Sequence, residues 1–207
     1  MSPFPEQMSD HWWWRPGVRP GRRLLVWHIL FHDHADIQAL VAECQNRLGG
    51  VAGIDAVPAE WLHMTTQIVG FEDEISSGEM QDMTAAAAKR LQLLGPVTVE
   101  VGKPLFHSEA VVLGIRPPQA LDPVRAGIRE AIAETVAAHQ LDDEPEWTPH
   151  ISVAYSNSEG PAAPVMAALR PRPAPRSATI REVHLVSQVR DGHLYRWERV
   201  TAVPLGG

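Results

Sequence analysis

The alternation of apolar and polar positions predicts a series of strands and helices along the chain. Residues 23–31 and 61–71 are apolar segments typical of strands, and residues 36–50 between them repeat apolar side chains at helical spacing as far as Gly49 and Gly50. The same patterns predict helices at 78–94 and from Asp122 onward, and strands at 97–103, 109–115, 146–155, 180–189 and 194–203.

The way these elements alternate indicates the fold class. Short apolar-polar alternation is more typical of antiparallel sheets than of buried parallel ones, so we expect an α+β fold. Asp122 and Pro123 are expected to cap and begin the helix that follows them. Residues 156–178 are rich in Pro, Ser and Ala, and we expect a long loop there.

Length and cysteine content narrow the class of protein. The 207 residues suffice for one large domain or two lobes sharing a cleft. Cys44 is the single cysteine, which excludes an intrachain disulfide, and its place on an apolar helical stripe predicts a packing role. No stretch approaches the roughly 20 apolar residues of a membrane span, and the N-terminus lacks the apolar core of a signal peptide. We therefore expect a cytoplasmic monomer without a membrane partner.

Charge separates an N-terminal segment from the rest of the chain. The formal net charge of −7 argues for a small substrate rather than extended nucleic acid. Residues 1–23, however, form an arm rich in Trp and Arg, and residues 24–207 are expected to form a single domain. Trp14 and Arg15 are candidate substrate contacts, because a tryptophan can stack on a base while an arginine binds phosphate. Packing of the arm on the body is the favoured alternative, since three adjacent tryptophans cannot all face one ligand.

Two histidines occupy matching positions in two predicted strands. The segment LHMTTQIVG contains His63 followed by Thr65, and PHISVAYSN contains His150 followed by Ser152. Side chains two apart in a strand point to the same face, so each histidine shares a face with a hydroxyl residue. Tyr155 is expected on the opposite, core-facing side of its strand. Each pair lies in the later strand of a strand-helix-strand half, as two similar halves facing each other across a cleft would place them.

Such a pair of histidines has a specific chemical use. Opening a strained cyclic phosphodiester requires a base that takes a proton from water and an acid that protonates the departing oxygen. Two imidazoles can do both without a metal ion, one neutral and one protonated. Hydroxyl donors beside them can bind the non-bridging phosphate oxygens.

Segments 61–71 and 147–155 resemble the paired His-x-Thr/Ser signatures of the two-histidine phosphoesterase superfamily, in particular its bacterial RNA 2',3'-cyclic phosphodiesterase (2'-5' RNA ligase-like) branch. The closing segment VHLVSQVRDGHLYRWERVTAVPL is also similar to the C-terminal strand pair of that branch. The resemblance implies a bilobed fold in which two pseudo-twofold-related antiparallel sheets, with flanking helices, enclose a central cleft.

The resemblance also implies an activity and roles for the motif residues. The activity is metal-independent and cofactor-free opening of a 2',3'-cyclic phosphate, on an RNA 3' end or a small nucleotide, to a 2'-phosphate, with reverse 2'-5' joining in some members. His63 and His150 would be the acid-base pair, and Thr65 and Ser152 would bind phosphate. The alternatives are a phosphoesterase of the same fold acting on a specialised metabolite, and a nucleotide- or RNA-binding module without turnover.

Several other polar residues are weaker candidates. His28 lies in the first strand and could contact substrate if that strand borders the cleft. A metal site around His32, Asp33 and His34 is the less favoured interpretation, because polar residues are expected at a strand-to-helix turn. Tyr195 and Arg196 could reach phosphate or base, or pair at the surface. The remaining histidines without a partner pattern, expected to be structural or exposed, are His107, His139, His184 and His193.

Overall fold

The computed structural model describes residues 5–141 and 147–206. Its strands are β1 (Gln7–Met8), β2 (Leu24–Leu30), β3 (Ile54–Ala56), β4 (His63–Phe71), β5 (Val97–His107), β6 (Ala110–Arg116), β7 (His150–Ser156), β8 (Gly160–Pro161), β9 (Arg176–Ile180), β10 (Glu182–Arg190) and β11 (Tyr195–Pro204). Its helices are α1 (Ala35–Leu48), α2 (Ser77–Leu91), α3 (Asp122–Thr135) and α4 (Ala163–Ala168), with short 3-10 turns at Ala59–Trp61 and Glu72–Glu74.

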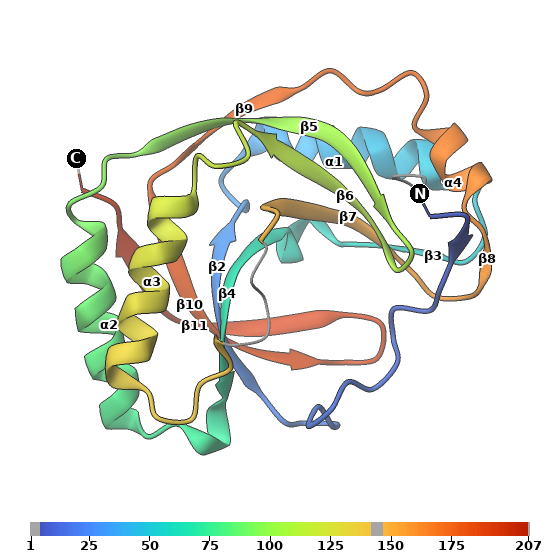
Figure 1. Ribbon diagram of the computed structural model, residues 1–207. Coiled ribbons are helices and arrows are strands. Elements are labelled where there is room, and N and C mark those ends of the chain that lie inside the picture. Colours follow the sequence, from blue (N-terminus) through green and yellow to red (C-terminus); the bar gives the residue numbers. More distant parts are fainter. Residues whose placement is uncertain (1–4, 142–146, 207) are drawn as a thin grey trace.

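Two antiparallel sheets form the two lobes (Figure 1). The four-stranded sheet has the order β11-β10-β2-β4, and the five-stranded sheet has the order β3-β7-β6-β5-β9. The motif strands β4 and β7 belong to different sheets and contact each other. This arrangement confirms the α+β, bilobed architecture expected from the sequence.

The helices link the lobes into one body. Helices α2 and α3 pack side by side, and they contact β11 and β4 of the four-stranded sheet (Figure 1). Helix α1 instead contacts β7 and β9 of the five-stranded sheet, and it leads from β2 of the four-stranded sheet to β3 of the five-stranded one. Its buried stripe is Ile37, Leu40, Val41, Cys44 and Leu48, as the helical spacing predicts. No helix among the described residues is long and apolar enough to cross a membrane.

Some local predictions differ from the structure. Residues 156–178 are not a continuous loop, because they contain α4 and the start of β9. Prolines hide this helix in the sequence, but Pro164 lies in its first turn, where a missing N–H costs nothing. Asp122 is the first residue of α3 rather than its cap, and the cap position is held by Leu121, which forms no side-chain cap bond. The strand expected from residue 146 begins at His150, and residue 146 lies outside the described residues.

A β-bulge in β7 changes the direction of one aromatic side chain. Val111 pairs with Ala154 but Val112 pairs with Ser152, which leaves Val153 as an extra residue in the strand. The simple alternation therefore fails beyond Ser152, and Tyr155 lines the space between the lobes rather than only the core. Tyr155 contacts the core as expected, but for this reason it also borders the cleft, which the simple alternation did not predict.

Candidate active site

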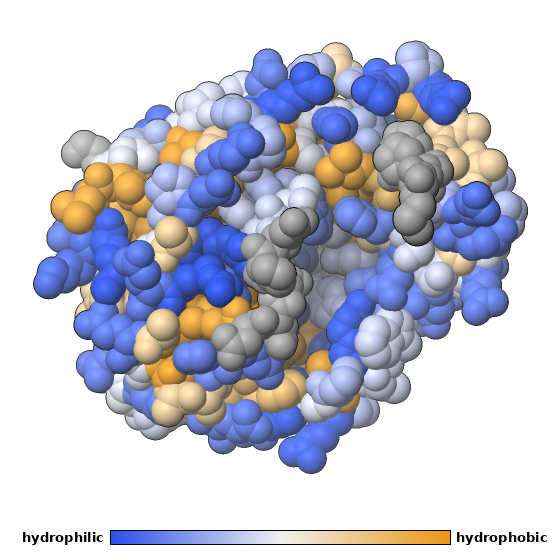
Figure 2. Space-filling view, in the orientation of Figure 1, coloured by the Kyte–Doolittle hydropathy of each residue, from blue (hydrophilic) through white to orange (hydrophobic). Residues whose placement is uncertain are grey.

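A cleft of about 540 Å³ lies between the lobes and contains both sequence motifs. His63 and Thr65 of β4 line it from one lobe, and His150 and Ser152 of β7 line it from the other. The face drawn in Figure 2 is hollowed near its centre, between the two halves of the molecule. The structure therefore brings together the four residues that the two motifs predict as a site.

Both motif histidines are held by the same local contact. Nδ1 of His63 donates to the carbonyl of Trp61 at 2.9 Å, and Nδ1 of His150 donates to the carbonyl of Thr148 at 2.7 Å. In each case the acceptor is two residues earlier, where the chain enters the strand. A proton fixed on Nδ1 leaves Nε2 of each neutral ring as a lone-pair acceptor. Two imidazoles with matching tautomers thus line one cleft.

The environment of His63 keeps its ring neutral. Burial lowers the pKa of His63 to about 4, against the opposing effect of the Trp61 hydrogen bond, and positive charge on His150 lowers it further. The ring of Trp197 from β11 stands edge-on to it, with centroids 4.8 Å apart. At neutral pH the His63 ring is therefore uncharged, and its pKa depends on the charge of His150 across the cleft.

His28 supports His63 and does not face the cleft. Its side chain is 1% exposed, and its ring centroid lies 4.3 Å from that of His63. Its Nε2 donates to the side-chain oxygen of Gln188 at 2.9 Å, which fixes the ring orientation. Burial holds the pKa of His28 well below its ordinary value, so the ring is neutral. The structure therefore places His28 behind the side chains that line the cleft, and a substrate contact by His28 stays a prediction.

The hydroxyl residues of the motifs lie beside the histidines. Thr65 and Ser152 both border the cleft, and Ser152 is 9% exposed. Burial raises the pKa of the neighbouring Tyr155, and a side-chain hydrogen bond with Ser152 opposes that shift. The site therefore presents hydroxyl groups from both lobes next to the imidazoles.

The N-terminal arm packs on the body and also forms part of the cleft wall. Trp12 is 4% exposed, and its indole N–H donates to Asp55 at 3.0 Å. Trp13 and Trp14 are both 48% exposed. Trp13 and Arg15 line the cleft, whereas Trp14 borders a neighbouring depression. Of the two candidate contacts in the arm, the structure thus places Arg15 in the cleft and Trp14 outside it.

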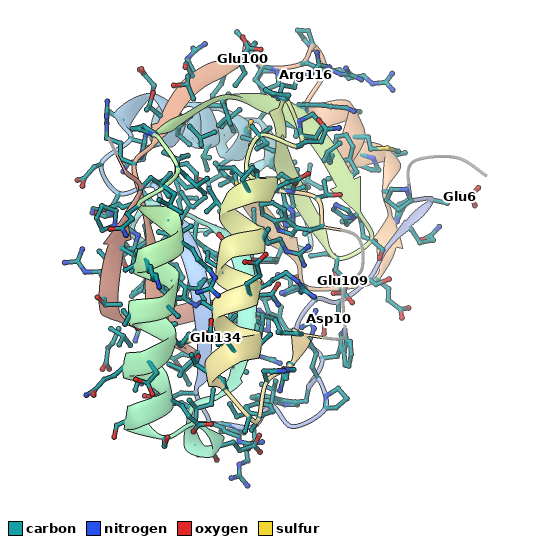
Figure 3. The ribbon with its side chains drawn as sticks, turned by 60° about the vertical axis from the view of Figure 1, so that its left-hand side comes forward. Glu6, Asp10, Glu100, Glu109, Arg116 and Glu134 are labelled. Atoms are coloured by element: carbon teal, nitrogen blue, oxygen red, sulfur yellow. The ribbon has the colours of Figure 1, made fainter. Side chains whose placement is uncertain are left out.

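Glu109 anchors the arm across the cleft. It follows β5, and Figure 3 shows it near Asp10 of the arm. Its carboxylate accepts from the Trp13 indole at 2.8 Å and from Arg15 at 2.9 Å, and it lies 3.3 Å from Nδ1 of His11. Burial, and then the charge of Arg15, lowers the pKa of His11 to about 4, so His11 is neutral at pH 7.

Several cleft residues were missed from the sequence or given only a weak role. His107 lines the cleft with its ring centroid 6.1 Å from that of His150, and Tyr195, Gln188 and Arg190 extend the wall from the β10–β11 hairpin. They come from hairpins distant in sequence and carry no local spacing signal. Arg196 is exposed and pairs with Asp191 at 3.0 Å, which agrees with the surface alternative.

The structure also bears on a metal site at the strand-to-helix turn and on the reactivity of the single cysteine. Among residues 5–141 and 147–206, no group of three or more His, Cys, Asp or Glu side chains is arranged to hold a metal ion. His32 pairs with Asp33 at 3.0 Å in the strand-to-helix turn. Cys44 is buried, and burial raises the pKa of its thiol to about 11, so the thiol is unreactive.

A known protein family matches most of the chain. Residues 31–192 match the family model described as the 2'-5' RNA ligase superfamily. The chain belongs to this superfamily. Both histidine motifs lie inside the matched region, which confirms the resemblance inferred from the sequence, whereas the N-terminal arm lies before it. Comparison with curated proteins gives no match.

Several solved structures have the same fold as this protein. TT0787 of Thermus thermophilus is 18% identical with a TM-score of 0.69, covering 89% of this chain and 98% of that one. E. coli LigT, solved in complex with 3'-AMP, is 19% identical with a TM-score of 0.67, and the match covers 90% of this chain and 99% of LigT. The PDE domain of MHV ns2 is 10% identical with a TM-score of 0.56, and the match covers 86% of this chain and 99% of that domain. At these identities the likeness supports the fold.

Proposed function

We propose that this protein is a metal-independent cyclic phosphodiesterase that opens a 2',3'-cyclic phosphate, on an RNA 3' end or a small nucleotide, to a 2'-phosphate. The observation that carries the proposal is the matched pair of imidazoles. His63 and His150 are held by equivalent backbone carbonyls and line one cleft from opposite lobes. Binding alone would not require two titratable rings arranged in this way.

The two histidines have different roles in this proposal. His63 is neutral because of its burial, so its Nε2 accepts a proton from water as the water oxygen attacks phosphorus. The bond from phosphorus to O3' breaks on the opposite side, and protonated His150 donates its proton to O3'. The product is a 2'-phosphate with a free 3'-hydroxyl. The same steps with a 5'-hydroxyl in place of water would form a 2'-5' linkage.

The hydroxyl residues complete the proposed mechanism. Thr65 and Ser152 border the cleft beside the two imidazoles, where their O–H groups can donate to the non-bridging phosphate oxygens. Such donors stabilise a transition state if they bind the redistributed charge more tightly than the ground state. Complexes of E. coli LigT with 3'-AMP and with phosphate support a nucleotide phosphate as the ligand of this fold.

Product analysis tests this function. The purified protein is incubated in EDTA with adenosine 2',3'-cyclic phosphate and with an oligonucleotide ending in a cyclic phosphate, and the products are compared with 2'- and 3'-phosphate standards. The expected product is the 2'-phosphate, formed in EDTA and lost in His150→Ala. A 3'-phosphate would contradict the proposed leaving group, and loss of activity in EDTA would contradict metal independence. Absence of turnover on both substrates would favour the metabolite or binding alternative.

A further inference from the structure

A second depression, of about 630 Å³, lies next to the active cleft, and its lining combines tryptophans with arginines. Trp14 from the arm, Trp61 from the segment before β4 and Trp197 from β11 contribute its aromatic side chains. The rings of Trp61 and Trp197 meet edge-on with centroids 4.8 Å apart, and Trp14 is 48% exposed. The depression thus combines one exposed indole and two partly buried ones with arginines. Aromatic side chains beside cationic groups are typical of surfaces that stack the bases of single-stranded nucleic acid.

Arg190 lies at the boundary of the two depressions and lines both. Its guanidinium lies 4.0 Å from the centre of the Trp14 ring and donates to the Trp13 carbonyl at 3.2 Å. The neighbouring Trp13 lines the active cleft, so the arm presents one indole to each depression.

The charges around the second depression distinguish Arg190 from its neighbours. Arg196 pairs with Asp191 at 3.0 Å, and Arg23 pairs with Glu198 at 3.2 Å. Within the described part of the chain, Arg190 forms no ion pair with a carboxylate, and its guanidinium donates to backbone carbonyls instead. Its positive charge therefore stays available to a phosphate at the boundary.

Resting on the proposed function, we infer that the second depression binds the nucleotide that precedes the cyclic phosphate, and that the substrate is accordingly an RNA 3' end. The terminal nucleotide occupies the active cleft and the preceding base stacks on Trp14. The phosphodiester that joins them lies at Arg190. Trp14, on which the base stacks, lies before the region matched by the family, whereas Trp61 and Arg190 lie inside it.

The first test measures binding without turnover. Affinities are determined for 3'-AMP and for the dinucleotide ApAp ending in a 3'-phosphate, using wild type, Trp14→Ala and the control Val200→Ala. Val200 is 43% exposed on the same strand as Trp197 and does not line the depression. Stacking of one base predicts that wild type binds ApAp about 5- to 150-fold more tightly than 3'-AMP. Trp14→Ala should remove this gain, and Val200→Ala should keep it.

Arg190→Gln tests the position of the linking phosphate. Loss of one phosphate contact should weaken ApAp binding and make its affinity less steeply dependent on salt concentration. Equal affinity of wild type for ApAp and 3'-AMP would overturn the subsite, as would a gain that survives in Trp14→Ala. If the salt dependence of ApAp binding is unchanged in Arg190→Gln, Arg190 does not bind the linking phosphate.

Turnover of the cyclic forms separates this inference from the proposed function. Wild type should show a higher kcat/KM for ApA 2',3'-cyclic phosphate than for adenosine 2',3'-cyclic phosphate, and Trp14→Ala should bring the two values together. If neither compound turns over while the Trp14-dependent binding gain persists, the proposed hydrolysis is wrong and the subsite stands. If both turn over at equal kcat/KM and the binding gain is absent, the hydrolysis stands and the subsite is overturned.

Discussion

The burial of His63 predicts a pH dependence of folding stability whose size follows from its pKa. The unfolded chain protonates this ring below about pH 6.5, whereas the folded protein does so only below about pH 4. Between these values the unfolded state binds more protons, so the free energy of unfolding falls as the pH is lowered. A difference of two to three pKa units corresponds to about 3 kcal/mol. This stability is fully present above pH 6.5 and is lost by about pH 4.

His63→Gln isolates this contribution because glutamine does not titrate. Urea unfolding curves at pH 7.5, 6.5, 5.5 and 4.5 give the free energy of unfolding of each protein. Between pH 7.5 and 4.5, wild type should lose about 2–3 kcal/mol more than His63→Gln. Buried His11 titrates in both proteins, so its contribution cancels in this difference. Charge on His63 also lowers the pKa of His28, so the difference includes the coupling between these two rings.

His107→Gln is the matched control, because it removes an exposed histidine from the same cleft. This variant keeps His63 in place, so the loss of stability assigned to His63 between pH 7.5 and 4.5 should persist in it. Parallel curves for wild type and His63→Gln would refute the argument, since they would mean that the folded protein protonates His63 as easily as the unfolded chain does. An NMR titration of the His63 Cε1–H resonance measures the same pKa directly.

Three further expectations follow from the site and the arm. The plot of kcat/KM against pH should be bell-shaped. Its acid limb should lie near pH 4, where His63 gains a proton, and its alkaline limb where His150 loses one. An acid limb centred near pH 6.5 would contradict the role of a buried His63 as the base. Trp12→Ala should lower the free energy of unfolding in urea by about 3–5 kcal/mol, because Trp12 is buried. The exposed control Leu93→Ala should lower it by less than about 0.5 kcal/mol. Equal effects of the two substitutions would refute the anchoring of the arm by Trp12. Glu109→Gln should lower the free energy of unfolding by about 1 kcal/mol, because it weakens the contacts of Glu109 with Trp13 and Arg15. Chymotrypsin should also cleave this variant at Trp13 faster than it cleaves the control Glu159→Gln. Equal cleavage rates would count against the anchoring of the arm by Glu109.

The sequence predicted the placement of the motif residues because that placement depends on local periodicity. His63 and Thr65 share a face of β4, and His150 and Ser152 share a face of β7, as side chains two apart in a strand must. The later strands of the two halves then meet across the cleft. The α+β class followed from the same alternation.

Other parts of the site depend on contacts that no local pattern records. The bulge at Val153 is an irregularity of pairing between β6 and β7, and it decides that Tyr155 borders the cleft. Arg190 reaches the site from the β10–β11 hairpin, and Glu109 reaches it from the turn after β5, so both depend on tertiary packing. The burial of His28 behind His63 likewise depends on how β10 and β4 flank β2.

The central claim is that His63 and His150 act as one acid-base pair, and a double-variant comparison tests it most directly. kcat/KM for adenosine 2',3'-cyclic phosphate in EDTA is measured for wild type, His63→Ala, His150→Ala and the double variant, with His107→Ala as control. Each single variant should lose about 10²- to 10⁴-fold, and the double variant should lose little more, because residues acting as a unit are not additive. A single variant within tenfold of wild type, or losses that multiply in the double variant, would contradict the paired mechanism.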